Sequence, residues 1–157
     1  MLKTNVTTGW QQAHMGHWLS QALQRFDARV LSLMAGNAEV PLALSNLAAR
    51  GSLSASHIHI TRHLALEGLR LTELARRAGV SKQAMGKLVE QCAAWGMVTR
   101  QDDPRDARAR RIVFTPMGLA WLTAFRQAVV VAEEELQVAV GVDVATVMAL
   151  GLEAYAT

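Results

Sequence analysis

Polar and basic side chains share one face of a helix that is predicted to follow Ser81. The opposite face is an apolar stripe at spacings of three and four residues, formed by Met85, Leu88, Val89 and Cys92. This leaves Lys82, Gln83 and Lys87 on the free face. An amide can pair with the edge of adenine, an ammonium group can donate to guanine or phosphate, and the methyl group of Ala84 can touch thymine. These side chains could therefore bind DNA.

A shorter helix precedes this one and is expected to hold it in place. Thr72 can cap a helix with Leu74 and Ala78 on one face, and Gly79 supplies the backbone freedom that ends it. Ser81 can then cap the following helix. Two short helices joined by a glycine turn form a helix-turn-helix, whose second helix can enter the major groove of DNA.

The sequence pattern changes period after Gly96. Residues 97–100 and 111–114 are short β-prone runs on either side of the charged segment 102–110, which contains Pro104. We predict a β-hairpin with an arginine-rich tip. Arg105 at this tip is the candidate for a minor-groove contact, because a narrow minor groove concentrates negative potential.

Positive charge is concentrated in the same part of the chain. Ten of the sixteen Lys and Arg residues lie between Arg70 and Arg111, with five of the thirteen acids, although the net charge of the whole chain is only +3. Such a concentration is the electrostatic footprint of phosphate binding. The alternative, a solvated charged surface, does not explain why the bases are concentrated in one segment.

The hairpin residues resemble the wing signature of the MarR family of bacterial winged-helix regulators. The resemblance rests on the Asp-Pro-Arg-Asp-Ala-Arg run at 103–108, on residues 112–115 and on Gly118, with residues 71–98 matching the family's helix-turn-helix. It implies a mainly α fold with a small β-hairpin wing. It also implies a single MarR-like domain over 1–157, in which a winged helix-turn-helix at 53–115 is flanked by dimerisation helices at 11–52 and 116–157.

The residues predicted to contact DNA lie on the second helix and on the wing. Glycine weakens a helix by roughly 1 kcal/mol, so Gly86 needs a reason, either close approach of DNA or packing on a neighbouring helix. The resemblance implies that Asp106 and Arg108 pair to hold the tip in shape, with Arg108 also near phosphate. The predicted contacts are Ser81 and Lys82 near phosphate, Gln83, Ala84, Gly86 and Lys87 at the bases, and Arg105, Asp106 and Arg108 on the wing.

The outer segments read as amphipathic helices. Helical stripes occupy about 11–35 and 42–50, a helix capped by Ser54 covers 55–66, and Thr115-Pro116 starts a helix that runs to about Val140. Gly141 ends that helix, and Asp143 can cap a last one. Helices longer than the central domain can cover need a partner, which the resemblance makes a second copy of the chain. The alternative is that they fold back on their own domain.

Composition narrows the class of protein. A chain of 157 residues with 51% hydrophobic residues is long enough for one core, and its single cysteine excludes an internal disulfide. No apolar run is long enough to cross a bilayer and no signal-peptide pattern is present, so we expect a cytoplasmic protein without membrane contact. No glycine-rich loop or nucleophile motif indicates an enzyme, and no cofactor is expected.

A few side chains are candidates for binding an effector that controls DNA binding. By resemblance, a small aromatic or phenolic effector could bind between the dimerisation helices and the winged domain. The candidate ligand residues are Trp18, His57, His59 and His63. Histidines four apart can also chelate a metal, but no cysteine or acidic cluster accompanies them, so no metal site is predicted. Cys92 belongs to the apolar stripe and reads as a small core residue.

Together these features predict a sequence-specific DNA-binding transcriptional regulator. By resemblance it would be a ligand-responsive homodimeric repressor on a pseudo-palindromic operator in double-stranded DNA. Two alternatives stay open: a winged-helix adaptor that binds proteins instead of DNA, and a metal-responsive regulator.

Overall fold

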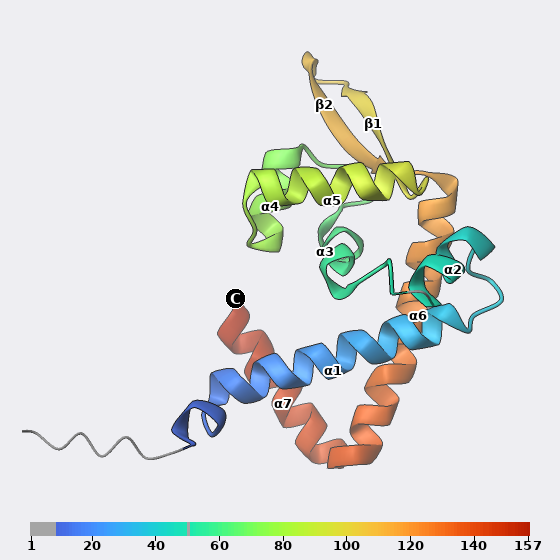
Figure 1. Ribbon diagram of the computed structural model, residues 1–157. Coiled ribbons are helices and arrows are strands. Elements are labelled where there is room, and N and C mark those ends of the chain that lie inside the picture. Colours follow the sequence, from blue (N-terminus) through green and yellow to red (C-terminus); the bar gives the residue numbers. More distant parts are fainter. Residues whose placement is uncertain (1–8, 50) are drawn as a thin grey trace, which may run out of the picture.

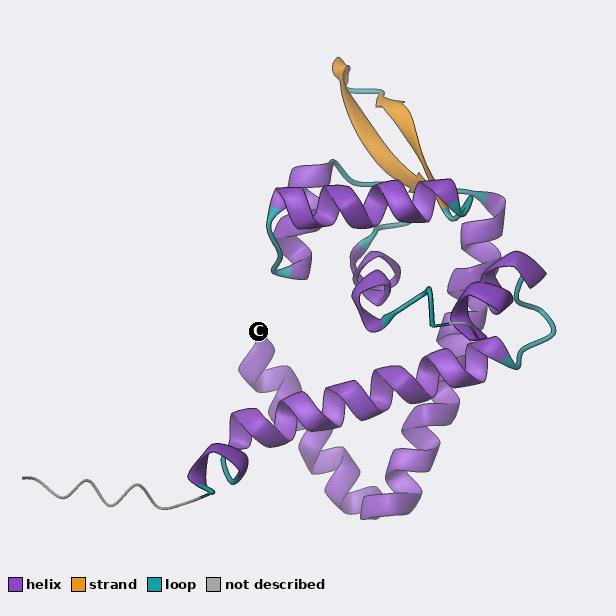
Figure 2. Cartoon of the chain, viewed as in Figure 1, coloured by secondary structure: helices purple, strands orange, loops and turns teal. Residues whose placement is uncertain are grey.

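The part of the chain that the structure describes contains seven α-helices, one short 3-10 helix and one hairpin. This computed structural model describes residues 9–49 and 51–157, so the predicted end of the second helix at Arg50 lies outside it. Figure 2 shows the mainly helical chain with its one hairpin, which confirms the predicted fold class. A short 3-10 turn, Trp10–Gln12, comes first. The elements that follow are α1 (Met15–Ala35), α2 (Leu42–Ala49), α3 (Ala55–His63), α4 (Leu71–Ala78), α5 (Lys82–Ala94), β1 (Val98–Asp103), β2 (Asp106–Phe114), α6 (Pro116–Val140) and α7 (Val142–Ala156).

The elements fall into two layers in space. In Figure 1, α3, α4 and α5 lie together in the upper half with the hairpin rising above them, while α1 and α7 lie in the lower half. The long helix α6 runs down one side and connects the hairpin to α7. The hairpin and the outer helices are thus at opposite ends of the molecule.

The helix-turn-helix forms where the sequence predicts it, with one difference at its start. Gly79 ends α4 with a φ of +67°, and the hydroxyl of Ser81 accepts a hydrogen bond from the backbone N–H of Ala84 at 3.1 Å. The predicted cap at Thr72 is wrong, because the chain stays extended through Arg70 and α4 begins at Leu71. Thr72 therefore lies inside the first turn of α4.

The inward face of α5 belongs to the core. Met85, Val89 and Cys92 are fully buried and Leu88 packs against them half-buried, which confirms the predicted stripe. The wider core adds side chains from α3, α4 and α6. It includes Ile58, Ile60, Leu74, Met97 and Trp121.

The wing has longer strands and a tighter turn than predicted. Antiparallel pairing runs from Val98 opposite Phe114 to Asp102 opposite Arg110, and the register then shifts so that Asp103 lies opposite Asp106. Residues 102–110 are therefore not one long loop. Their charged side chains are compatible with strands because most of them are exposed on a two-stranded hairpin.

The segment before α4 forms an isolated antiparallel β-bridge with the base of the wing. Leu69 and Ile112 exchange backbone hydrogen bonds of 3.0 and 2.8 Å. Gly68 makes this approach possible, because its φ is +86° and a Cβ there would lie 2.5 Å from a methyl group of Val113. The wing is thus joined to the helix-turn-helix at its base.

The start of α6 explains why Thr115 is followed three residues later by Gly118. Thr115 caps the helix by accepting a hydrogen bond from the N–H of Gly118 at 3.0 Å, and Pro116 occupies the first turn as predicted. A Cβ on Gly118 would lie 1.9 Å from the carbonyl oxygen of Met97. Only glycine therefore lets α6 pack this closely on the start of β1.

Several predicted helix ends are corrected. Helix α1 begins at Met15 instead of about Gln11, because the ring of His14 accepts a hydrogen bond from the N–H of His17 at 3.2 Å and acts as the cap. Helix α3 ends at His63, since the chain becomes extended at the buried Leu64. Gly141 ends α6 as predicted, but α7 follows at once and the predicted cap residue Asp143 lies in its first turn.

The outer helices bury only part of their apolar surface. On α6 the buried line is Trp121, Ala124, Phe125, Ala128 and Ala132, while Leu119 near the start of the helix is 44% exposed. No single helix in the described ranges is both long and apolar enough to cross a membrane. Helices α6 and α7 meet that test only as a pair, and they bend by 119° at their junction.

Candidate nucleic-acid interface

The free face of α5 is exposed as the sequence predicts. Lys82, Gln83, Ala84 and Lys87 are exposed, as is the capping residue Ser81. The hydroxyl of Ser81 is engaged by the backbone of α5, whereas the lysine and glutamine residues are exposed to solvent. The first turn of α5 also presents unpaired backbone N–H groups, which favour an anion. This face can therefore accept base edges and phosphate oxygens.

Gly86 lies in the middle of this face without a packing reason to be glycine. A Cβ built at Gly86 would meet only Cδ2 of Leu71, at 3.8 Å, which is an ordinary van der Waals contact. The neighbouring helix α4 would therefore accept alanine at this position. Of the two reasons weighed for this glycine, close packing within the protomer is not supported.

Two aspartates shape the wing tip through backbone hydrogen bonds. Asp103 Oδ1 accepts from the N–H of Arg105 at 2.9 Å, and Asp106 Oδ1 accepts from the N–H of Arg108 at 3.0 Å. Each is the two-residue contact by which aspartate stabilises a turn. The expected pairing of Asp106 with Arg108 is thus made through a backbone amide. The second carboxylate oxygen of Asp106 lies 3.6 Å from Nη2 of Arg70.

Arg70 is the site residue that the sequence analysis missed. Its Nε donates to Asp103 Oδ2 at 2.8 Å, across 33 residues of sequence. Asp103 is only 7% exposed, and its pKa is held below the ordinary value by the N–H of Arg105 first and by the Arg70 guanidinium second, against the effect of burial. Arg70 appeared in the sequence only as one base among ten, and no spacing rule connects it to the wing.

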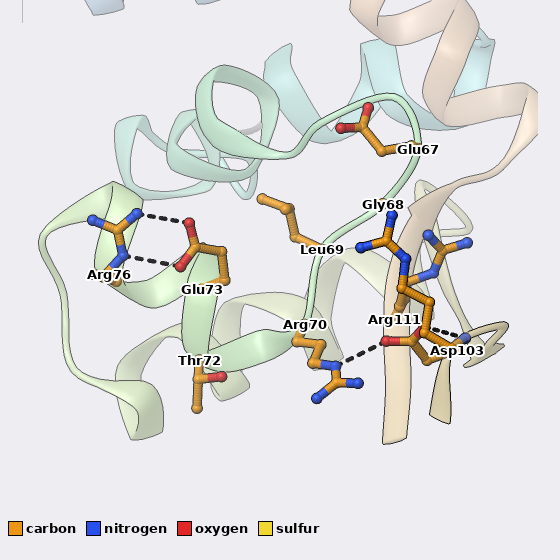
Figure 3. Close-up of a pocket in the computed structure, with 10 residues that line it drawn as sticks. Glu67, Gly68, Leu69, Arg70, Thr72, Glu73, Arg76, Asp103 and Arg111 are labelled. Atoms are coloured by element: carbon orange, nitrogen blue, oxygen red, sulfur yellow. Dashed lines mark hydrogen bonds and ion pairs between the residues drawn. The ribbon is translucent and has the colours of Figure 1, made fainter. Parts of the chain in front are cut away.

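A depression of about 460 Å³ separates α4 from the wing (Figure 3). Figure 3 shows Arg70 reaching Asp103 on one side and Arg76 paired with Glu73 on the other. Hydrogen bonds from Arg76 and Arg77 lower the pKa of Glu73 to about 2, so this carboxylate stays charged well below neutral pH. The lining is Glu67, Gly68, Leu69, Arg70, Thr72, Glu73, Arg76, Asp103, Arg105 and Arg111.

His57 is one of the candidate ligand residues, and both of its ring nitrogens have hydrogen-bond partners within the protein. Its Nδ1 accepts from the N–H of Ser54 at 3.0 Å, and its Nε2 lies 2.8 Å from Oε1 of Gln91 on α5. The ring also packs against Trp95 at 4.7 Å between centroids. His57 is 6% exposed and connects α3 to the inner side of α5.

The other candidate ligand residues lie on two helices, α3 and α1. The rings of His59 and His63 stack at 6.1 Å, and Nδ1 of His59 is buried without a hydrogen-bond partner. Burial lowers the pKa of His63, and the charges of His59, Arg62 and Arg77 lower it further. Trp18 is 58% exposed on α1, with its ring 5.2 Å from that of His17. Within residues 9–49 and 51–157 no group of three or more His, Cys, Asp or Glu side chains is placed to hold a metal ion.

Known proteins share features of sequence and fold with this chain. A sequence model described as MarR family matches residues 43–109. No curated protein matches the chain in sequence. Among solved structures, the chain resembles the transcriptional repressor CouR bound to a 23-mer DNA duplex, with a TM-score of 0.66 and 19% identity over 98% of this chain and 100% of that one.

Two further structures contain small molecules. CouR from Rhodococcus jostii RHA1 bound to p-coumaroyl-CoA gives a TM-score of 0.65 and 20% identity, over 90% of this chain and 91% of that one. A MarR family protein of Mycobacterium tuberculosis in complex with salicylic acid gives 0.61 and 22%, over 90% and 96%. At these identities the likeness establishes the fold. Residues 43–109 thus belong to the MarR family, and the chain that contains them has the winged helix-turn-helix fold of the family's transcriptional regulators.

Proposed function

We propose that this chain is a ligand-responsive, homodimeric transcriptional repressor that binds a pseudo-palindromic operator in double-stranded DNA. The observation that carries the proposal is the exposed face of α5, with Gln83 and Lys87 free of the core and the wing on the same side of the molecule. In this reading α5 enters the major groove while Arg105 reaches the adjacent minor groove. Ser81 and Lys82 then lie near phosphate at the start of α5.

The homodimer is supported by apolar side chains at the end opposite the wing. Exposed apolar patches larger than a few hundred Å² usually mark a site of interaction. A second copy of the chain would bury these side chains and leave both wings free, since α1 and α7 lie away from the hairpin (Figure 1). The segments 11–52 and 116–157 would be the dimerisation helices and 53–115 the DNA-binding region. The exposed residues are Trp18, Leu23, Val138, Val144, Val147, Leu150 and Tyr155.

A small aromatic carboxylate is the effector that the side chains favour. The ring of His59 stacks on that of His63, and its Nδ1 has no hydrogen-bond partner in the protein, so in our proposal this nitrogen donates to the carboxylate. Trp18 offers aromatic surface on α1. The solved structure with salicylic acid, a phenolic acid, supports the same class of ligand. In our proposal, binding this effector favours a dimer whose wings no longer match the operator.

In this proposal the protein acts in the cytoplasm, has no membrane partner and catalyses no reaction. Its test combines two measurements on the full-length protein. Light scattering after size exclusion should give twice the mass of the 157-residue chain. Gel shifts with fragments that the protein selects from its source genome should show a complex that weakens steeply with salt, because phosphate contacts release counterions. A dimer that binds no duplex more tightly than random DNA would instead indicate the adaptor, and a monomer would refute the proposed assembly.

A further inference from the structure

The wing is a two-stranded hairpin whose tip has little support of its own. Two strands alone are marginally stable in water, and the tip from Asp102 to Arg108 is exposed except for Asp103. The backbone bridge between Leu69 and Ile112 holds only the base of the hairpin. Something further along the strands must fix the angle of the tip relative to α5.

Arg70 supplies this connection. It is the N-cap residue of α4 and therefore belongs to the helix-turn-helix. Its guanidinium donates from Nε to Asp103 at the end of β1, at 2.8 Å, and places Nη2 3.6 Å from Asp106 at the start of β2. One side chain thus engages both strands of the wing next to the turn. A planar guanidinium can hold two carboxylates in this way, whereas a lysine ammonium acts as a point charge.

The connection continues to the residue that is proposed to enter the minor groove. While Asp103 Oδ2 accepts from Arg70, its other oxygen accepts from the backbone N–H of Arg105. Two hydrogen bonds therefore lead from the start of α4 to the backbone of Arg105. We propose that Arg70 is a positioning residue for DNA binding, which sets the place of Arg105 relative to the recognition helix α5 through Asp103.

The chain contains a matched control for this role. Arg76 lines the same depression and carries the same charge, but its guanidinium is held by Glu73 on its own helix, at 2.9 and 2.7 Å. Arg76→Ala therefore removes one positive charge near the wing without removing a link to it. Arg70→Lys is the conservative variant, since it keeps the charge and loses the planar fork.

The first arm of the test needs no DNA. Amide hydrogen exchange is measured on the free full-length protein as wild type, Arg70→Ala, Arg70→Lys and Arg76→Ala. We expect faster exchange in the wing peptide 101–109 for Arg70→Ala, a smaller increase for Arg70→Lys, and wild-type exchange for Arg76→Ala. Wild-type exchange in Arg70→Ala, or equal increases in the two alanine variants, would overturn the link between Arg70 and the wing.

The second arm rests on the proposed function and uses a double-mutant cycle with Arg105→Ala on the operator duplex. We expect Arg70→Ala to weaken binding about tenfold, the scale of one lost charge-assisted hydrogen bond, and to have almost no further effect when Arg105 is already alanine. Independent tenfold losses would mean that Arg70 contacts phosphate itself and would overturn the positioning role. If the wild-type protein binds no operator, the proposed function fails, while the exchange measurement still decides whether Arg70 holds the wing.

Discussion

Replacing Gly86 by alanine separates folding from DNA binding in a single residue. The structure leaves room for the added methyl group, whose nearest neighbour would be Leu71 Cδ2 at 3.8 Å, and the backbone there is ordinary helix. Alanine in place of glycine inside a helix should therefore stabilise each protomer by up to about 1 kcal/mol. For a chain of this size that corresponds to a rise in Tm of about 2–4 °C.

The same methyl group would stand on the face that is proposed to meet the bases. If DNA approaches α5 as closely as the account requires, Gly86→Ala should weaken operator binding by about 1–3 kcal/mol, the usual cost of one mismatched base pair. Thermal unfolding at fixed protein concentration and gel shifts at fixed salt measure the two effects. Light scattering shows whether the variant keeps the wild-type assembly.

Either of two results would refute this reasoning. A lower Tm for Gly86→Ala would mean that α4 and α5 pack more closely around this position than the structure shows. A higher Tm with unchanged DNA affinity would mean that Gly86 does not face the bases. The predicted combination, a more stable protein that binds its operator less well, is not expected from a substitution that merely disturbs the fold.

Three further predictions concern the wing, the contact between α1 and α3, and the buried thiol. Arg105→Ala should weaken operator binding and reduce the slope of log affinity against log salt concentration by about 1 per protomer. Asp106→Ala should weaken binding with little change in this slope, because it alters the shape of the wing and removes no phosphate contact. Gel shifts over a salt series measure both effects, and unchanged affinity in both variants would contradict the wing assignment. Arg62→Ala leaves the carboxylate of Asp27, which is 5% exposed, without its ion-pair partner, and should lower the free energy of unfolding in urea by about 3 kcal/mol. Burial raises the pKa of Cys92 to about 12, so the thiol stays protonated at pH 8. It should therefore react with iodoacetamide only when urea unfolds the protein. Rapid labelling of the native protein would instead show that α5 opens locally.

The sequence predicts best what neighbouring residues decide. The caps at Ser81 and Thr115 and the glycine stop at Gly79 depend on contacts within a few residues, and all three are confirmed. The inward stripe of α5 follows from helical spacing alone and is also confirmed. Local pattern rules apply here because the hydrogen bonds that cap α5 and α6 join residues three apart in the sequence.

Two of the differences between sequence and structure depend on segments that are distant in the sequence. Thr72 could cap a helix, but the pairing of Leu69 with Ile112 keeps the chain extended up to Arg70 and moves the start of α4. The contact of Arg70 with Asp103 spans 33 residues and has no sequence signature. The positions of the candidate ligand residues depend on how α1 and α3 pack, which the sequence does not show.

The most direct test of the central claim is selection of genomic fragments by the purified full-length protein, followed by footprinting of the enriched sites. If α5 and the wing read DNA as a dimer, a few promoters should be enriched, and each footprint should contain two inverted half-sites about one helical turn apart. Lys87→Ala and Arg105→Ala should reduce that enrichment. No fragment enriched over bulk genomic DNA, or equal enrichment by the wild type and both variants, would contradict the account.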